Sequence, residues 1–548
     1  MKLHKKISIL ALGCLVATSC SDLNDQFPEG SELTQDQMQE TNEIKPDRVD
    51  ATFSGMFTMM GDPYGVFGAS QGRADDFGFI MSAISLDAEA SDLILADNDY
   101  NWFSPACDLT SRDANYANPY IRYVIPYRQI GIANEIIASY PADTQDQEVI
   151  YRIAQARAMR AFDYLSLAPY FQFSYTTAPD QPCIPLLSGD VDYTNNPRAT
   201  VAEVYAAIME DLNYAVEHLE GYDRGSDKTK IDLNVAYGLR ARAYLNMGMY
   251  AEAAADAEKA LQGYQPASMS AVSTPSFCNI NEGNWIWGID ITDTQAQNGG
   301  YATASSWISA FSGNGYAAAT GTTPVINKLL YDKIPATDVR KGWWLNEDKE
   351  SPMLEGLTWA STGVSGQDIV DLVLSDGSKI AYDAYTNVKF GMQSGVGSIL
   401  NNNDWPLMRA EEMILVQAEG LAKSGNEAQA RTVLQNFVQG YRDPSYTIPT
   451  YRSLENEIWF QRRVELWGEG FGTSDIKRLN KPIVRFHDET SSTNYPTAFA
   501  FNVAANDGWL NMRFPQTEMD NNLAIVDNSE GTQPASGQNG SLRDGVTD

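Results

Sequence analysis

Two stretches decide the fold: LRARAYLNMGMYAEAAADAEKAL at residues 239–261 and ILVQAEGLAKSGNEAQARTVLQNF at residues 414–437. In each stretch an alanine is followed by a glycine seven positions later and by a second alanine 12 positions later. These residues are Ala241, Gly248 and Ala253 in the first stretch, and Ala418, Gly425 and Ala430 in the second. Alanines let two helices approach closely, and a glycine ends a helix and turns the chain. Each stretch therefore predicts a helical hairpin.

The spacing within the hairpins resembles the tetratricopeptide repeat. The two copies lie 177 residues apart, so they do not form a simple tandem array, and long inserts must separate the helical pairs. Helical patterning also dominates elsewhere. Thr200 and Glu203 form a capping box before an apolar face that runs to Leu219, and residues 147–168 show the same periodicity. The chain is therefore expected to be mainly α.

Composition and charge exclude several classes of function. Among the 548 residues, 39 are Lys or Arg and 71 are Asp or Glu, which gives a net charge of −32 and disfavours nucleic acid as a partner. Only three histidines are present, so hydrolases that need a His base and His-rich metal sites are disfavoured. None of the five cysteines forms a C-x-x-C pair. We expect no catalytic residues, no metal site and no cofactor.

The N-terminus has the pattern of a targeting signal. A basic head and the apolar run 7–16 precede the small residues Ala17, Thr18 and Ser19, and then Cys20. This pattern predicts a lipoprotein signal peptide at residues 1–19 with Cys20 as the lipidated residue. An ordinary signal peptide, or cleavage at Cys14, are the alternatives. Residues 20–45 are expected to form a lipidated flexible tether and residues 529–548 a flexible tail.

The segment 264–400 differs from the helical parts, because it is rich in Gly, Ser, Thr, Asn and aromatic residues. Sugars have weakly apolar faces and rings of hydroxyls, so a sugar site needs aromatic platforms with polar neighbours. Two groups provide both. The candidate ligand-binding residues are Asn98, Asp99, Asn101 and Trp102 in the first group, and Tyr301, Trp307, Phe311 and Tyr316 in the second.

Each candidate group has competing interpretations. Trp285 and Trp287 alternate in the pattern of a strand and are predicted to pack in the core, as is the pair Trp343–Trp344. Asp97-x-Asp99-x-Asn101 resembles the start of a calcium loop, but Trp102 stands where such a loop needs Gly. The paired acids Asp75–Asp76 and Glu411–Glu412 are the carboxylates that a glycoside hydrolase mechanism would use.

Several blocks in order along residues 20–527 resemble the SusD/RagB family of nutrient-binding outer-membrane lipoproteins. The acidic, serine-containing stretch after Cys20 also resembles the surface-export signal of Bacteroidetes lipoproteins. The other blocks are YIRYVIPYRQIGIANEIIASYP (120–141), ARAMRAFDYLSLAPY (156–170), PCIPL (182–186), PLMRAEEMILVQAE (406–419), RRVELWGEGFGTSDIKRLNK (462–481) and FPQTEMDNN (514–522). The chain departs from the family pattern at Gln461, where a Glu is usual, near Gly472, where an Arg is usual, and at Leu523, where a Pro is usual.

The resemblance implies a tetratricopeptide-like α-α scaffold of about four helical pairs, with a long irregular loop-rich insert and a few short strands. It implies one domain at residues 46–528, with helical pairs at 232–263 and 407–440 and a ligand-binding insert at about 264–400. Such proteins bind without catalysis. They sit on the cell surface, lipid-anchored in the outer membrane, as the lid of a SusC-like TonB-dependent transporter to which they deliver glycans or, in some branches, peptides. A tetratricopeptide-like protein-interaction scaffold is the alternative, and a glycoside hydrolase is the third.

Overall fold

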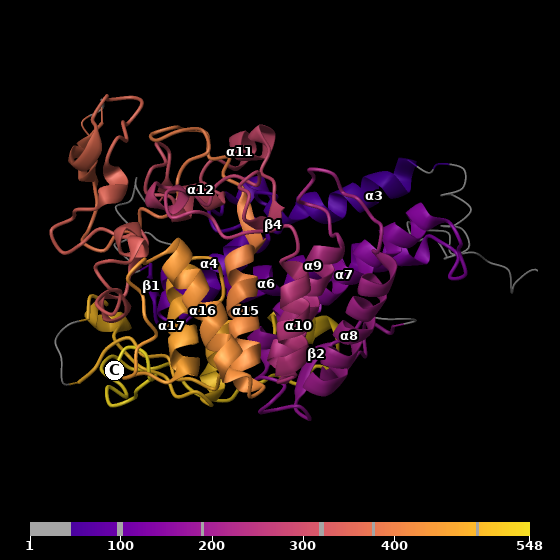
Figure 1. Cartoon of the computed structure of the whole chain (residues 1–548). Helices are drawn as coiled ribbons and strands as arrows, with labels where there is room; N and C mark the ends of the chain where they lie inside the picture. Colours follow the sequence, from indigo (N-terminus) through magenta and orange to yellow (C-terminus); the bar gives the residue numbers. More distant parts are fainter. Residues whose placement is uncertain are drawn as a thin grey trace, which may run out of the picture.

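The structure of the protein is a computed structural model that describes residues 45, 47–95, 102–187, 191–316, 323–374, 377, 379–488 and 493–548. Helices stand side by side through the middle of the molecule, and the segments between them cover one end (Figure 1). Strands within the described residues are short and form only two-stranded antiparallel pairs. The predicted mainly α class is confirmed.

The scaffold is a row of helices in which each helix packs against the next one. The row places α15 (Ala410–Lys423) beside α10 (Tyr250–Ala260), although about 150 residues separate them in the chain, and α17 (Leu454–Glu465) packs on the other side of α15 (Figure 1). The row consists of α6 (Ala117–Ala138), α7 (Gln147–Phe171), α8 (Val201–His218), α9 (Leu233–Met247), α10 (Tyr250–Ala260), α15 (Ala410–Lys423) and α16 (Glu427–Tyr441).

Both predicted hairpins are present, as α9–α10 and α15–α16. Gly248 ends α9 in the left-handed conformation at φ 75°, as the turn requires. The capping box also forms, because the Thr200 side chain accepts from the backbone of Glu203 and the Glu203 side chain accepts from the backbone of Thr200. Local sequence signals therefore set the ends of these helices.

Close contact between α10 and α15 joins the two hairpins. A Cβ atom built on Gly420 of α15 would lie 2.5 Å from the carbonyl oxygen of Tyr250 and 2.9 Å from the amide nitrogen of Ala254. Only a residue without a side chain allows this approach. The small residues of the second hairpin thus bring together two segments that are distant in the sequence.

Gly420→Ala is expected to lower the free energy of unfolding by about 1–3 kcal/mol, because the added methyl group meets rigid backbone on α10. The matched control is Gly131→Ala in α6, where a Cβ atom has nothing within 4 Å. That change is expected to raise stability by about 0.5–1 kcal/mol, since Ala is the better helix former. Urea unfolding of both variants measures the two effects, and equal shifts would show that the α10–α15 contact is not tight.

The remaining elements surround the row. The remaining helices are α3 (Asp47–Thr58), α4 (Phe79–Glu89), α5 (Ser104–Cys107), α11 (Asp293–Gly299), α12 (Ala304–Ile308), α14 (Lys328–Tyr331), α17 (Leu454–Glu465), α18 (Gly472–Arg478) and α19 (Gln516–Asn521). The strand pairs are β1 (Leu93–Ile94) with β5 (Val325–Ile326), β2 (Pro182–Pro185) with β3 (Arg198–Thr200), β4 (Trp285–Ile289) with β8 (Trp405–Arg409), and β6 (Asp371–Val373) with β7 (Lys379–Ala381).

The β4–β8 pair joins the insert to the scaffold. Ile289 at the end of β4 lies opposite Trp405 at the start of β8, so residues 290–404, which make up most of the insert, leave and return at neighbouring positions. Trp285 and Trp287 of β4 are fully buried, and so are Trp343 and Trp344 within the insert. Their interpretation as packing residues agrees with this burial.

The C-terminal residues differ from the expectation of a flexible tail at 529–548. Asp544 is buried and pairs with Arg463 of α17 at 2.6 Å, and the carbonyl oxygen of Asp544 accepts from Lys481 at 2.8 Å. Val546 is also buried, at 2% exposure. A polar segment with few apolar residues is therefore held here by charge pairing with the scaffold, which its composition alone does not reveal.

Candidate functional site

The candidate ligand-binding residues fall into three groups in the structure. Trp102 is half-buried and Tyr301 is 43% exposed, so both present surface to solvent. Trp307 and Phe311 have no exposed surface, and Tyr316 keeps 7%. Those three are therefore corrected to buried supporting residues, because neighbouring rings and backbone cover their faces. The others, together with the lipidation residue, lie outside the described residues: Asn98, Asp99, Asn101 and Cys20.

A run of aromatic rings brings the two predicted groups together. Phe103, next to Trp102, packs edge-on against Trp307 with ring centroids 4.7 Å apart. Trp307 in turn contacts Tyr316 at 4.3 Å, and Tyr316 contacts Tyr301 at 6.0 Å. The Trp307 indole also donates to the carbonyl oxygen of Ala74 at 2.9 Å, which fixes its orientation. The buried rings thus form a base that joins the segment after residue 101 to the insert.

Arg73 is a site residue that the sequence reasoning missed. Its guanidinium carbon lies 4.5 Å from the centroid of the Trp102 ring and 5.3 Å from that of Phe67. Its side chain keeps 23% of its surface exposed. Two of its N–H groups bind Asp75, at 3.0 and 2.8 Å, and a guanidinium has five donors, so donors remain for a ligand. Its position two residues before the aspartate pair is the one sequence signal that it carries, and that signal does not reveal the neighbouring rings.

Asp75 and Asp76 hold this arrangement in place. The Asp75 side chain is almost fully buried beneath Arg73, and Asp76 accepts from the backbone of Val66 and Phe67 at 2.8–3.2 Å. Burial raises the pKa of Asp75, and the opposing charge of Arg73 only partly offsets it. Both carboxylates have structural partners, so this pair provides positioning for Phe67 and Arg73.

We call Phe67, Arg73, Trp102 and Tyr301 the Trp102 site. It offers aromatic surface for the apolar face of a ring, and a fixed cation with spare hydrogen-bond donors. Tyr64 links its two sides, because the Tyr64 hydroxyl donates to the carbonyl oxygen of Gly299 at 3.0 Å. Aromatic surface beside directed polar donors is the combination that sugars require.

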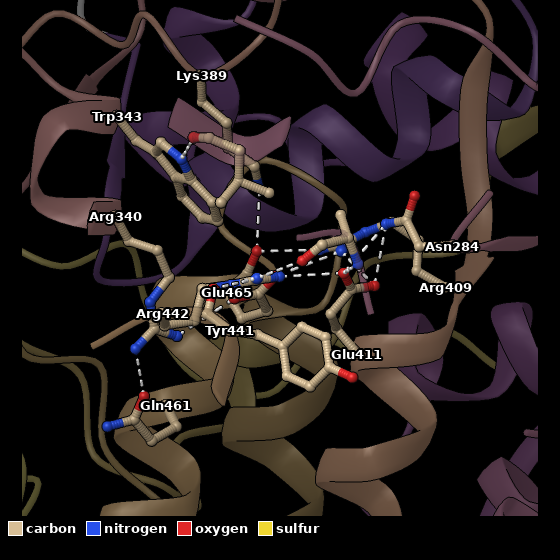
Figure 2. Close-up of polar contacts among 12 residues, drawn as sticks. Asn284, Arg340, Trp343, Lys389, Arg409, Glu411, Tyr441, Arg442, Gln461 and Glu465 are labelled. Atoms are coloured by element: carbon tan, nitrogen blue, oxygen red, sulfur yellow. Dashed lines mark hydrogen bonds and ion pairs between the residues drawn. The ribbon is translucent and has the colours of Figure 1, made fainter. Parts of the chain in front are cut away.

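A second polar cluster lies deep in the protein (Figure 2). Glu465 of α17 pairs with Arg340, Arg409 and Arg442. All four residues are buried, with at most 1% of their surface exposed. Arg409 also pairs with Glu411 at 2.9 Å and Glu469 at 2.7 Å. We call this set the Glu465 cluster; it comprises Asp338, Arg340, Lys389, Arg409, Glu411, Arg442, Glu465 and Glu469.

The Glu465 cluster is structural. Burial alone would raise the pKa of Glu465, but the guanidinium groups of Arg442, Arg409 and Arg340 outweigh burial and hold it below its ordinary value. Opposite charges balance within the cluster, and it connects α15, α17 and the insert (Figure 2). Glu412, the neighbour of Glu411, pairs instead with Arg242 at 2.6 Å. Both acids of this pair therefore form salt bridges, Glu411 with Arg409 and Arg442, and Glu412 with Arg242.

Two departures from the family pattern have local explanations. The Gln461 carbonyl oxygen accepts from Arg340, so the amide still serves the Glu465 cluster. At Gly472 a Cβ atom would lie 2.7 Å from Cβ of Ala90, and the Gly472 amide donates to Asp87 at 2.7 Å. No side chain fits at position 472 in this packing.

Other features of the described residues limit the chemistry. No group of three or more His, Cys, Asp or Glu side chains in that part of the chain is arranged to hold a metal ion. The segment that resembles the start of a calcium loop, Asp97 to Asn101, lies outside it. The described cysteines Cys107, Cys183 and Cys278 are free and buried. None of the described helices has the length and apolar character needed to cross a membrane.

Two family models match the sequence. The model of the SusD family matches residues 291–531, and the model described as "Starch-binding associating with outer membrane" matches residues 79–245. Together they include most of the scaffold, the insert, Trp102 and Tyr301. No curated protein matches the chain.

Solved structures share the fold. A SusD-like carbohydrate binding protein from Bacteroides vulgatus is 22% identical with a TM-score of 0.68, over 88% of this chain and 97% of that one. A SusD superfamily protein from Bacteroides thetaiotaomicron is 21% identical with a TM-score of 0.67, over 88% and 99%. Surface glycan-binding protein A from Bacteroides thetaiotaomicron, in complex with laminarihexaose, is 16% identical with a TM-score of 0.63, over 88% and 99%. At these identities the likeness is one of fold.

Proposed function

The chain belongs to the SusD-like family, and from this premise we propose that it is a cell-surface lipoprotein that captures a glycan at the Trp102 site. Two observations carry the proposal: Arg73 lies over the Trp102 ring, and a run of rings connects Phe103, the residue after Trp102, to Tyr301. A structural relative with a bound laminarihexaose supports a glycan as the ligand class. We expect binding without turnover.

We further propose that the protein works with a TonB-dependent transporter as its lid. The lipoprotein signal in the sequence and the family description, which names association with the outer membrane, support this placement. A lipid on Cys20 would tether the chain to the outer membrane, and a tether of about 25 residues would let the scaffold move relative to the membrane surface. The delivered ligand then passes from the Trp102 site to the transporter.

Affinity electrophoresis tests the ligand class. The chain from Ser21 onward is run through native gels that contain plant, fungal or host polysaccharides. Retardation by one polysaccharide class, without release of reducing ends, is the expected result. A polysaccharide that retards the protein and is also hydrolysed would contradict the proposal. Absence of retardation by every polysaccharide would favour a peptide ligand, and co-purification from the outer membrane then tests the transporter directly.

A further inference from the structure

A cavity of about 110 Å³ lies inside the scaffold and shares no residue with the Trp102 site. It is surrounded by α4, α7, α9, β8, α15, α17 and α18, so both halves of the scaffold contribute to its walls. Most of the wall is apolar. The apolar side chains include Phe79, Leu86, Phe162, Leu245, Val416 and Phe471.

One buried arginine in the wall has an unused donor. Arg462 is 4% exposed, and its Nε donates to Asp475 at 2.6 Å. Its guanidinium also lies 4.8 Å from the centroid of the Phe471 ring. Nη1 of Arg462 has no hydrogen-bond partner among the described residues. A buried charged donor without an acceptor is costly, so an acceptor supplied by a ligand would relieve that cost.

Charge around Arg462 does not balance. Arg462 begins a chain of ion pairs that runs through Asp475 to Arg478, at 2.6 and 2.8 Å. Arg478 continues to Glu419 at 2.6 Å, and Glu419 pairs with Lys423 at 2.9 Å. This series of ion pairs therefore holds three cations and two anions, an excess of one positive charge. The unpaired Nη1 of Arg462 lies at the end of the series.

The other charged groups of the wall are paired elsewhere. Arg242 binds Glu412, and Glu469 binds Arg409 and Lys389. Asp87, which shares a smaller neighbouring cavity with Arg462, accepts from the amides of two glycines rather than from Arg462. An anion from outside the protein would therefore complete the pairing of Arg462.

We infer that this cavity binds a small aliphatic monocarboxylate, with its carboxylate on Arg462 and its hydrocarbon chain among the apolar walls. The volume sets the size of the ligand. An apolar cavity of about 150 Å³ accepts benzene, which has six non-hydrogen atoms, so this cavity of about 110 Å³ accepts about four or five, the size of propanoate. A carboxylate is the acceptor that a guanidinium binds most strongly.

Entry does not require unfolding of the scaffold. Phe79, Leu86, Asn246 and Ser474 line the cavity and are each only half-buried. The cavity therefore reaches toward the surface along α4, the end of α9 and α18. A small ligand can therefore enter between these partly exposed side chains.

Saturation-transfer NMR tests the inference with propanoate as the probe and 1-propanol as its uncharged counterpart. The protein is the chain from Ser21 onward, which retains every described residue. Propanoate is expected to bind at one saturable site, and 1-propanol at least about tenfold more weakly, because it lacks the charge-assisted hydrogen bond. Failure of propanoate to saturate a site, or equal binding of the two probes, overturns the inference.

Two variants locate the site and one serves as the control. Arg462→Gln removes the charge and is expected to weaken propanoate binding at least about tenfold. Leu245→Phe fills the cavity without removing a charge, and is expected to do the same even where Arg462→Gln fails to fold. Arg240→Gln breaks a pair with Asp256 that does not line the cavity, so binding should stay unchanged. Unchanged binding in Leu245→Phe would contradict the assignment. Glycan retardation is independent of all three.

Discussion

Replacing Glu465 with Gln is expected to lower the free energy of unfolding by about 3–5 kcal/mol, the largest single effect on stability. The carboxylate accepts from Arg442 at both oxygens, at 2.8 Å, and from Arg340 and Arg409 at 3.2 and 3.3 Å. A neutral amide leaves these buried guanidinium groups short of one negative charge, and its N–H groups face donors. Chemical unfolding followed by circular dichroism measures the loss.

The control for Glu465 is Glu427→Gln. Glu427 forms a solvent-exposed pair with Arg431 one turn along α16, at 2.6 Å. Exposed pairs of this kind contribute about 0.3–0.5 kcal/mol, so the control should unfold almost as the parent does. If both variants lose the same small amount of stability, the Glu465 cluster is not the buried junction that the structure describes.

Trp102→Ala is expected to weaken glycan binding by about 30-fold, or about 2 kcal/mol, the largest single effect on the proposed function. The indole is the aromatic surface over which the Arg73 guanidinium lies, so its loss removes both the stacking face and a support of the arginine. Because Trp102 is only half-buried, the fold should remain intact. Affinity electrophoresis against the polysaccharide found in the screen measures the change.

Tyr451→Ala provides the matched control for Trp102. Tyr451 is 81% exposed and lies beside Arg452, just before α17, so it is an exposed aromatic outside the Trp102 site. Its removal should leave retardation by the polysaccharide unchanged. Equal loss in both variants would mean that general surface aromatics, rather than the Trp102 site, retard the protein.

The scaffold was largely predictable because its signals are local. The alanine–glycine spacing of the hairpins and the capping box at Thr200 act within one or two turns of helix, and the structure contains both. The adjacency of α10 and α15 was not predictable, since it depends on the contact of Gly420 with a segment 170 residues earlier in the chain. Periodicity identifies a packing face but does not name its partner.

For the candidate site, the sequence indicated two segments but not which of their side chains are exposed. Composition identified the segments around Trp102 and Tyr301, and the structure brings these segments together. It could not tell that Trp307 points inward and Tyr301 outward, because an aromatic in a Gly- and Ser-rich segment reads the same in both cases. Arg73 was missed because an isolated arginine gains meaning only from the ring beside it.

The family-like blocks around Arg409 and Glu465 contribute to the stability of the scaffold rather than to ligand binding. Arg409 lies in the block 406–419, and Glu465 and Glu469 lie in the block 462–481, and these side chains meet in the Glu465 cluster. The resemblance thus rests partly on buried ion pairs. Such motifs identify the scaffold and carry no information on the ligand.

The pairing of Ile289 with Trp405 has a consequence for how such a chain diversifies. Because the intervening loop begins and ends at adjacent strand positions, its length does not alter the geometry of its two attachment points. Lengthening a closed loop costs little, about 0.6 kcal/mol for each doubling. The exposed parts of this segment are therefore free to change in evolution, whereas Asp338, Arg340 and Lys389 have to keep their ion pairs in the Glu465 cluster for the helical row to be inherited unaltered.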